Sequence, residues 1–122
     1  MDRTPNANDF TIPVEGIGAF RFARRTMRDE LRIAAEFSRL TEGVETPTTY
    51  LATVAGWIAT LKVLTVEAPG GWIKNLDGKP TNNLDEIDPL DDETYATLLK
   101  VHAVLREKEG SFRRGKEQAG KE

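Results

Sequence analysis

The sequence predicts a mainly helical α+β domain, in which an N-terminal β-hairpin is followed by three main helices and a long acidic loop precedes the last helix. Residues 10–23 carry apolar side chains at alternate positions, which is the period of a β-strand. Residues 27–42, 47–66 and 92–109 carry them at helical spacing instead. Because a chain of 122 residues can bury one modest core, we expect a single domain over residues 10–112.

The hairpin is expected over residues 10–23. Apolar side chains alternate in 10–14 and again in 19–23, and the glycines of 15–18 supply the turn. Pro13 has no N–H to donate, so the first strand should lie at a sheet edge. A hairpin alone is marginal and must pack on something. The polar residues 1–9 are expected to be disordered.

The first helix is expected at about residues 27–42. Thr26 and Asp29 have the spacing of a capping box, and Gly43 suits the position just past a helix end. Its apolar face is broad because it contains two adjoining stripes. One stripe consists of Met27, Leu31, Ala34, Ala35 and Ser38, and the other of Ile33, Phe37 and Leu40. The more exposed positions are Arg28, Arg32, Glu36 and Arg39.

The second helix is expected at about 47–66, with Thr46 as N-cap and Pro47 at the first helical position. It is apolar nearly all round, so it is either the centre of the fold or half of an oligomer interface, and we expect both. The expected self-association residues are Tyr50, Val54, Trp57, Ile58 and Leu61. Residues 50–66 contain one charge but several threonines and little aliphatic bulk, so we expect a buried helix and no membrane partner.

An acidic stretch, residues 75–93, separates the second helix from the third and reads as an irregular, partly mobile loop. Asp91 or Asp92 should cap the third helix, at about 92–109, and Gly110 should interrupt it. Residues 113–122 are almost free of apolar side chains and are expected to form a flexible charged tail.

The residues that support catalysis or metal binding are few. The chain has no cysteine and one histidine, His102, which lies in an apolar helical stripe and is expected to be a packed histidine. The glycine pairs do not match a phosphate-binding loop. We therefore expect no enzyme activity, no cofactor and no metal site. The net charge of −3 also argues against a general affinity for nucleic acid.

Protein binding is the remaining class, and two features are candidates for it. Arginine side chains cluster where the hairpin meets the first helix, and their guanidinium groups suit carboxylates or phosphates. These candidate partner-binding residues are Arg21, Arg24, Arg25, Arg28 and Arg32. The alternative is a solvated face whose arginines pair with nearby Asp and Glu. Trp72, beside two glycines, is either a lid over the core or a partner anchor.

Four motifs in order resemble the small tail assembly chaperones encoded by long-tailed bacteriophages and prophages. They are F-T-I-P followed by G-x-F-R-F-x-R-R-T-M-R-D-E-L-R-I, P-T-x-Y-L-A-T-x-x-x-W, L-K-V-L-T-V-E-A-P-x-G-W and D-P-L-D-D-E-T-Y. The resemblance covers about Phe10 to Arg114. It implies a mainly helical, non-enzymatic protein of the infected host's cytoplasm that is absent from finished virions.

The resemblance also implies partners. Such chaperones bind the tape measure protein, keep it soluble and promote assembly of the tail tube, and in many phages a frameshift-extended form recruits the tail-tube protein. Two alternatives stay open from the residues. One is a structural virion protein, such as a head-tail connector or tail-completion subunit. The other is a small nucleic-acid-binding regulator that uses the arginine cluster.

Overall fold

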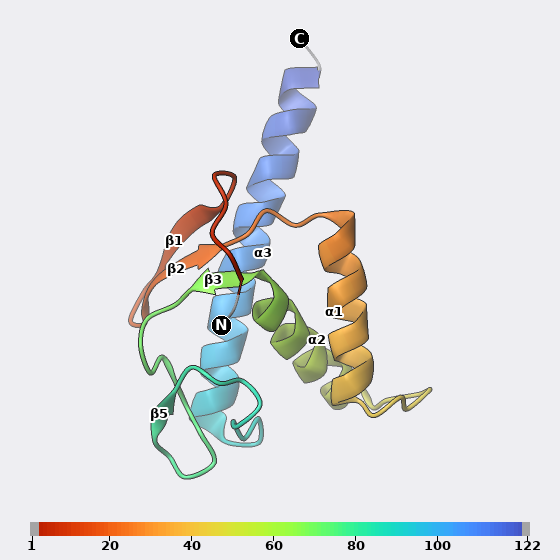
Figure 1. The fold of residues 1–122 in the computed structure, drawn as a ribbon, viewed down its shortest axis with the longest axis vertical. Coiled ribbons are helices and arrows are strands. Elements are labelled where there is room, and N and C mark those ends of the chain that lie inside the picture. The colour runs from red at the N-terminus through yellow and green to blue at the C-terminus, as the bar shows by residue number, and fades with distance from the viewer. Residues whose placement is uncertain (1–2, 121–122) are drawn as a thin grey trace.

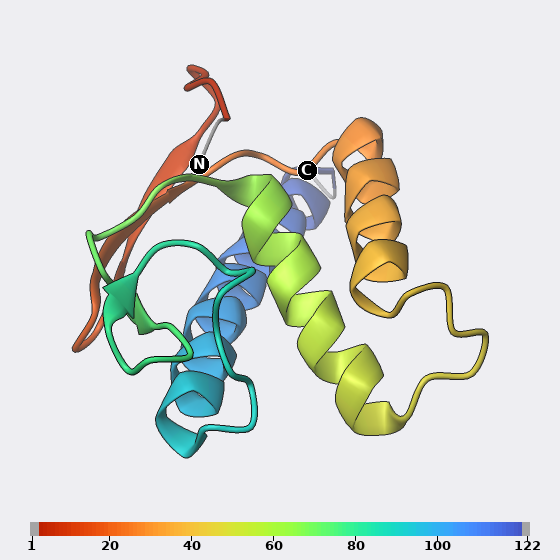
Figure 2. The same cartoon turned by 60° about the horizontal axis from the view of Figure 1, so that its bottom comes forward.

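A computed structural model describes residues 3–120, with side chains described as far as Phe112 (Figure 1). Its elements are β1 (Phe10–Val14), β2 (Gly18–Phe22), α1 (Met27–Leu40), α2 (Thr49–Leu64), β3 (Thr65–Glu67), β4 (Ile73–Lys74), β5 (Pro80–Thr81) and α3 (Asp92–Gly120). The predicted class is confirmed: a hairpin sheet precedes three helices in an α+β arrangement. Figure 2 shows α2 in the middle, with α1 on one side of it and the sheet with α3 on the other.

The N-terminal sheet is antiparallel and has the order β1-β2-β3. Phe10 lies opposite Phe22 and Val14 opposite Gly18, so the hairpin has the predicted strands and β1 is the predicted edge strand. Alternate side chains of the two strands, Ile12 and Phe20 among them, are buried against the helices. The apolar alternation thus fixes which face of the hairpin enters the core.

Both ends of α2 differ from the prediction. Thr48, not Thr46, is the N-cap, and its hydroxyl accepts a hydrogen bond from the Leu51 N–H at 3.1 Å. The helix ends at Leu64, and Thr65–Glu67 pairs with β2 as β3. The β-branched Thr65 and Val66 suit a strand, and pairing with the free edge of β2 supplies their backbone partners, which a helical pattern cannot reveal.

The acidic segment is more ordered than predicted. Its residues Pro80–Thr81 form β5, which pairs with β4 in a second, two-stranded sheet. Leu84 and Ile87 are buried in the core although acidic residues surround them in the sequence. Isolated apolar residues show no periodicity, so no pattern in this segment predicts that it enters the core.

The two ends of the chain also differ from the prediction. Residues 3–9 lie against the fold instead of being disordered, since Arg3 bonds to Asp29 of α1 and Asp9 pairs with Arg21 of β2. At the other end α3 does not stop at Gly110 but continues to Gly120, through residues that are mostly good helix formers. The predictions for residues 1–2 and 121–122 lie outside the described residues.

The core forms around α2. Its Leu61 and Leu64 are fully buried, as are Leu98 and Leu105 of α3. The stacked rings of Phe20 and Phe22, with centroids 5.7 Å apart, close the core on the side of the sheet (the full cluster also includes Ile12, Val14, Val54, Ile58, Ile73, Leu84, Ile87 and Val101). Among the described elements, α2 is the one that α1 contacts extensively, so α1 forms the outermost layer.

The start of α1 is held by a buried carboxylate. Asp29, 2% exposed, accepts hydrogen bonds from the backbone N–H of Thr26 at 3.0 Å and from the guanidinium of Arg3 at 2.7 Å. Thr26 in turn accepts from the Asp29 N–H, which completes the predicted capping box. Burial acts to raise the pKa of Asp29, but the bonds from Arg3 and Thr26 outweigh it and hold that pKa below its usual value.

Replacing Asp29 by Ala should therefore destabilise the protein. The change removes a helix cap and leaves Arg3 without its ion-pair partner. We expect the free energy of unfolding to fall by about 2–3 kcal/mol. This is less than the roughly 3–5 kcal/mol lost when a fully buried ion pair is broken, because Arg3 is partly exposed. Glu30→Ala is the matched control, since Glu30 pairs with Arg25 at an exposed position in the same helical turn and should cost less than about 1 kcal/mol. Urea unfolding of both variants measures the difference, and equal losses would contradict it.

Candidate functional site

The predicted arginine cluster does not form one surface. Arg21 bonds through Nε to Asp9 at 3.1 Å, so it fastens the N-terminal segment to β2. Arg25 bonds through Nε to Glu109 of α3 at 3.0 Å and through Nη1 to Glu30 at 2.8 Å. Both arginines brace the fold internally and are not available as partner-binding residues without breaking these pairs.

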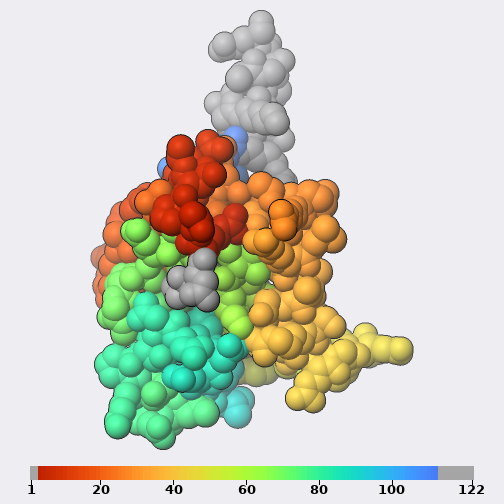
Figure 3. Space-filling view, in the orientation of Figure 1, coloured from red at the N-terminus to blue at the C-terminus, as the bar shows by residue number. Residues whose placement is uncertain are grey.

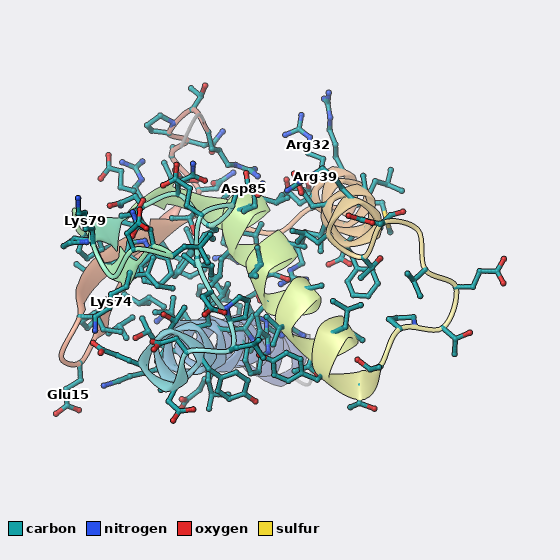
Figure 4. The ribbon with its side chains drawn as sticks, turned by 90° about the horizontal axis from the view of Figure 1, so that it is seen from below. Glu15, Arg32, Arg39, Lys74, Lys79 and Asp85 are labelled. Carbon is teal, nitrogen blue, oxygen red and sulfur yellow. The ribbon has the colours of Figure 1, made fainter. Side chains whose placement is uncertain are left out.

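The other three arginines are exposed. The guanidinium of Arg24 lies over the ring of Phe112, 3.9 Å from its centroid, in a cation-π contact. Arg28 and Arg32 of α1 have no ion pair among the described residues. Figure 4 shows Arg32 extending away from α1, whereas Arg39 of the same helix turns towards Asp85. Only the α1 part of the predicted cluster therefore faces solvent unpaired within the described chain.

A cleft of about 310 Å³ lies beside this cluster, between the end of the hairpin and α3. Arg24, Arg25 and Arg106 line it together with Glu109, which bonds to both Arg25 and Arg106. Since the acid already engages two of the three cations, the cleft is less basic than its composition implies.

The predicted self-association residues of α2 are mostly core residues. Val54, Ile58 and Leu61 are 0–5% exposed, because α3, the sheet and α1 cover the helix. Tyr50 and Trp57 stand at the edge of α2 and pack on Tyr95 of α3 (centroids 6.1 Å and 5.2 Å away). Of the five expected self-association residues, Val54, Ile58 and Leu61 are therefore not on the surface of the folded chain, whereas Tyr50 is 43% exposed.

Trp72 meets Phe20 edge-on, with ring centroids 5.1 Å apart, and is only partly exposed. Its indole Nε1 is buried and has no hydrogen-bond partner among the described residues. This packing favours the lid alternative over the partner anchor, because the indole is packed against the core cluster.

His102 is packed on the face of α3 that meets α2, with its ring 6.1 Å from that of Trp57. Burial, together with the nearby positive charges of Arg106 and Arg25, lowers its pKa to about 4, although Glu109 acts in the opposite direction. The imidazole is therefore neutral near pH 7. Within residues 3–112, no three His, Asp or Glu side chains gather as a metal site would require. None of the described helices combines the length and apolar content needed to cross a bilayer.

An exposed apolar surface lies on α1. Of its two predicted stripes, only Ile33, Phe37 and Leu40 pack on the core. The other stripe is exposed, with Met27 at 76% and Leu31 at 67%. Figures 1 and 3 show the reason: α1 stands at the outer edge of the molecule and meets its neighbour on one side only.

We call this surface the α1 stripe; it consists of Met27, Leu31, Ala34, Ala35 and Ser38, all of which are exposed. The sequence did contain a signal for this surface. The apolar arc of α1 is too wide for one neighbouring helix to cover, so part of it must stay exposed. What the sequence could not supply was which of the two stripes would face α2. In the structure Ile33, Phe37 and Leu40 pack towards the core, and Arg3 bonds to the buried Asp29 at the start of α1.

Comparison with known proteins does not identify the chain: no family model, curated protein or solved structure matches it.

His102 should make stability fall in mild acid. Its pKa of about 4 in the folded protein lies below the usual 6.5, so the unfolded chain binds a proton more tightly than the folded chain does. The stability that is present above pH 6.5 is therefore lost as the pH falls towards 4. At about 1.4 kcal/mol per pKa unit the loss is on the order of 3 kcal/mol. Asp29, Asp85 and Asp91 have lowered pKa values and titrate chiefly below this window.

Urea unfolding between pH 7 and pH 4 measures this dependence. The control is His102→Gln, which cannot gain a proton and should flatten the profile in that window even if its stability at pH 7 is lower. A variant that retains the slope of the original protein would assign the effect to other groups.

Proposed function

We propose that this protein is a phage tail assembly chaperone that binds the tape measure protein, keeps it soluble and promotes assembly of the tail tube. The observation that carries the proposal is the α1 stripe, an exposed apolar surface on a helix whose other face is fixed in the fold. The order of motifs that resembles this family is its second support.

The geometry of α1 suits a helical client. A helix of 14 residues is about 21 Å long at about 1.5 Å per residue, so a partner helix of similar length can lie along the whole stripe. Helix-in-groove and helix-on-helix recognition use this i, i+3, i+4 pattern of apolar anchors. A tape measure protein is a long, largely helical chain with apolar stripes of its own, and it stays out of aggregates only while these are covered.

The other parts of the role belong to the same proposal. The chaperone acts in the cytoplasm of the host, has no catalytic function, is absent from mature virions, and recruits tail-tube protein through a frameshift-extended form. Self-association would have to use a surface other than Val54, Ile58 and Leu61, since these are buried. The nucleic-acid alternative is weakened because Arg21 and Arg25 are engaged with acids.

Co-expression with the tape measure protein tests the proposal. The original protein should keep the tape measure protein in the supernatant and co-purify with it, and Leu31→Glu should reduce retention at least tenfold because a charge replaces an apolar contact. Leu76→Glu is the matched control: Leu76 is 71% exposed, like Leu31, but lies in the β4–β5 turn.

One result would contradict the α1 stripe as the binding surface, and another would contradict the chaperone role. Equal retention by the Leu31→Glu and Leu76→Glu variants would remove the α1 stripe as the binding surface. Mass spectrometry that finds the protein in stoichiometric amounts in purified virions would favour the structural alternative, a connector or tail-completion subunit.

A further inference from the structure

We infer that the α1 stripe takes a single helix of a different protein, one whose apolar side is edged by Asp and Glu where it meets Arg28 and Arg32. This inference rests on the proposed function, since it describes the partner of the same surface. It adds the chemistry of that partner, and it separates a foreign helix from a second copy of this chain.

Charge is distributed unevenly along the two edges of the stripe. At 3.6 residues per turn, Arg28, Arg32 and Arg39 follow one edge. The opposite edge carries Glu30 and the partly buried Phe37. A helix laid on the stripe therefore meets three cations on one side and one anion on the other.

The free cations of this edge lie towards the start of α1. Arg39 is already bonded to Glu36 and Asp85, each at 2.8 Å. Arg28 and Arg32 are exposed and have no ion pair among the described residues. Arginine forks left without a partner at a surface select planar carboxylates, so the partner's acids should lie opposite these two residues.

Arg32 is the cation without a described ion pair in its surroundings. An open concavity of about 550 Å³ beside it is lined by Arg3, Thr4, Arg32, Lys62 and Val63. Arg3 and Lys62 are paired with acids, Arg3 with Asp29 and Lys62 with Glu36 and Asp85. Their charges are partly neutralised, which leaves Arg32 as the cation on this side with no described ion pair.

A second copy of the chain fits this charge pattern poorly. Antiparallel pairing about a two-fold axis brings like edges together, so Arg32 would face its own symmetry mate and Arg28 would approach Arg39 of the other copy. Parallel pairing offers only Glu30, which already accepts a hydrogen bond from Arg25 at 2.8 Å. Like charges therefore disfavour the antiparallel pair, and the parallel pair offers Arg28 and Arg32 only an acid that is already engaged, whereas a foreign helix with an acidic edge supplies carboxylates to both arginines.

The size of the stripe points in the same direction. The stripe has five side chains, far fewer than the roughly 20–30 residues that each partner contributes to a stable complex. The stripe alone is thus too small to hold a permanent dimer. It suits a reversible contact in which charge sets orientation and encounter rate.

The shape of the stripe also constrains the partner. Its large side chains, Met27 and Leu31, lie towards the start of α1, and its small ones, Ala34, Ala35 and Ser38, towards the end. A partner helix packs closely only if it places bulky residues over the alanines and small residues over Met27 and Leu31. The expected client segment therefore has an apolar stripe that tapers in the opposite sense.

Two synthetic helical peptides of 18 residues test the inference with the full-length protein. Both carry the same tapered Leu/Ala stripe, and one edge carries Glu in the first peptide and Lys in the second. By fluorescence anisotropy, the Glu peptide should bind at least tenfold more tightly than the Lys peptide, and the difference should shrink at 0.5 M salt.

The double variant R28E/R32E should reverse this preference. The matched control is K79E/K100E, which changes the net charge equally at exposed lysines in the β4–β5 turn and on α3. Circular dichroism checks that both variants retain the helical content of the original protein. If R28E/R32E keeps the preference for the Glu peptide, or if the control loses it, the assignment to Arg28 and Arg32 is overturned.

The remaining outcomes separate this inference from the proposed function. Sedimentation that shows a dimer of the original protein, lost in the Leu31→Glu variant, would assign the stripe to a second copy and overturn the inference. Peptide discrimination without retention of the tape measure protein would leave the inference standing and refute the chaperone role. Retention of the tape measure protein with no discrimination between peptides would refute the inference and leave the chaperone role standing.

Discussion

The burial of α2 is the constraint on which the rest of the structure depends. Leu61 and Leu64 have no exposed surface, and α3, the N-terminal sheet and α1 are arranged around them. Because α2 is apolar nearly all round, it needs cover on every side, and a chain of this length has little material with which to supply it. Leu84 and Ile87 of the acidic segment are buried and supply part of this cover. α1 then covers the last open side, and nothing in the described chain covers α1 in turn.

The arginines divide between fold and surface according to whether an acid lies within reach. Arg25 joins the hairpin–helix connection to α3 through Glu109, and Arg3 joins the N-terminal segment to α1 through Asp29. These bridges tie the connection into α1, and the first turn of α1, to distant parts of the chain. Arg28 and Arg32 form no such bridge within the described residues. Their replacement should therefore leave the fold intact but weaken the binding of a partner.

Local signals made much of this fold predictable. The alternation of residues 10–23 identified the hairpin and its buried face, and Thr26 with Asp29 identified the start of α1. The failures share a physical cause, which is dependence on distant residues. β3 exists because β2 offers a free edge, and Arg25 is withdrawn from the surface by an acid 84 positions away. The same dependence applies to Val54, Ile58 and Leu61: periodicity shows that α2 is apolar, but not which of its residues the rest of the chain buries.

An exposed apolar stripe is a liability unless the helix that carries it is held in place. α1 meets this condition at both ends: Asp29 and Thr26 cap its start, and at its end the N–H of Gly43, at a φ of +72°, donates to the Ser38 carbonyl at 2.9 Å. Its inner stripe is locked against α2 by Ile33, Phe37 and Leu40. The outer stripe is therefore presented on a rigid element, so a partner would lose little of its binding energy to ordering this side of the contact. That preorganisation allows a surface of a few side chains to bind reversibly, which is what the proposed chaperone role requires of it.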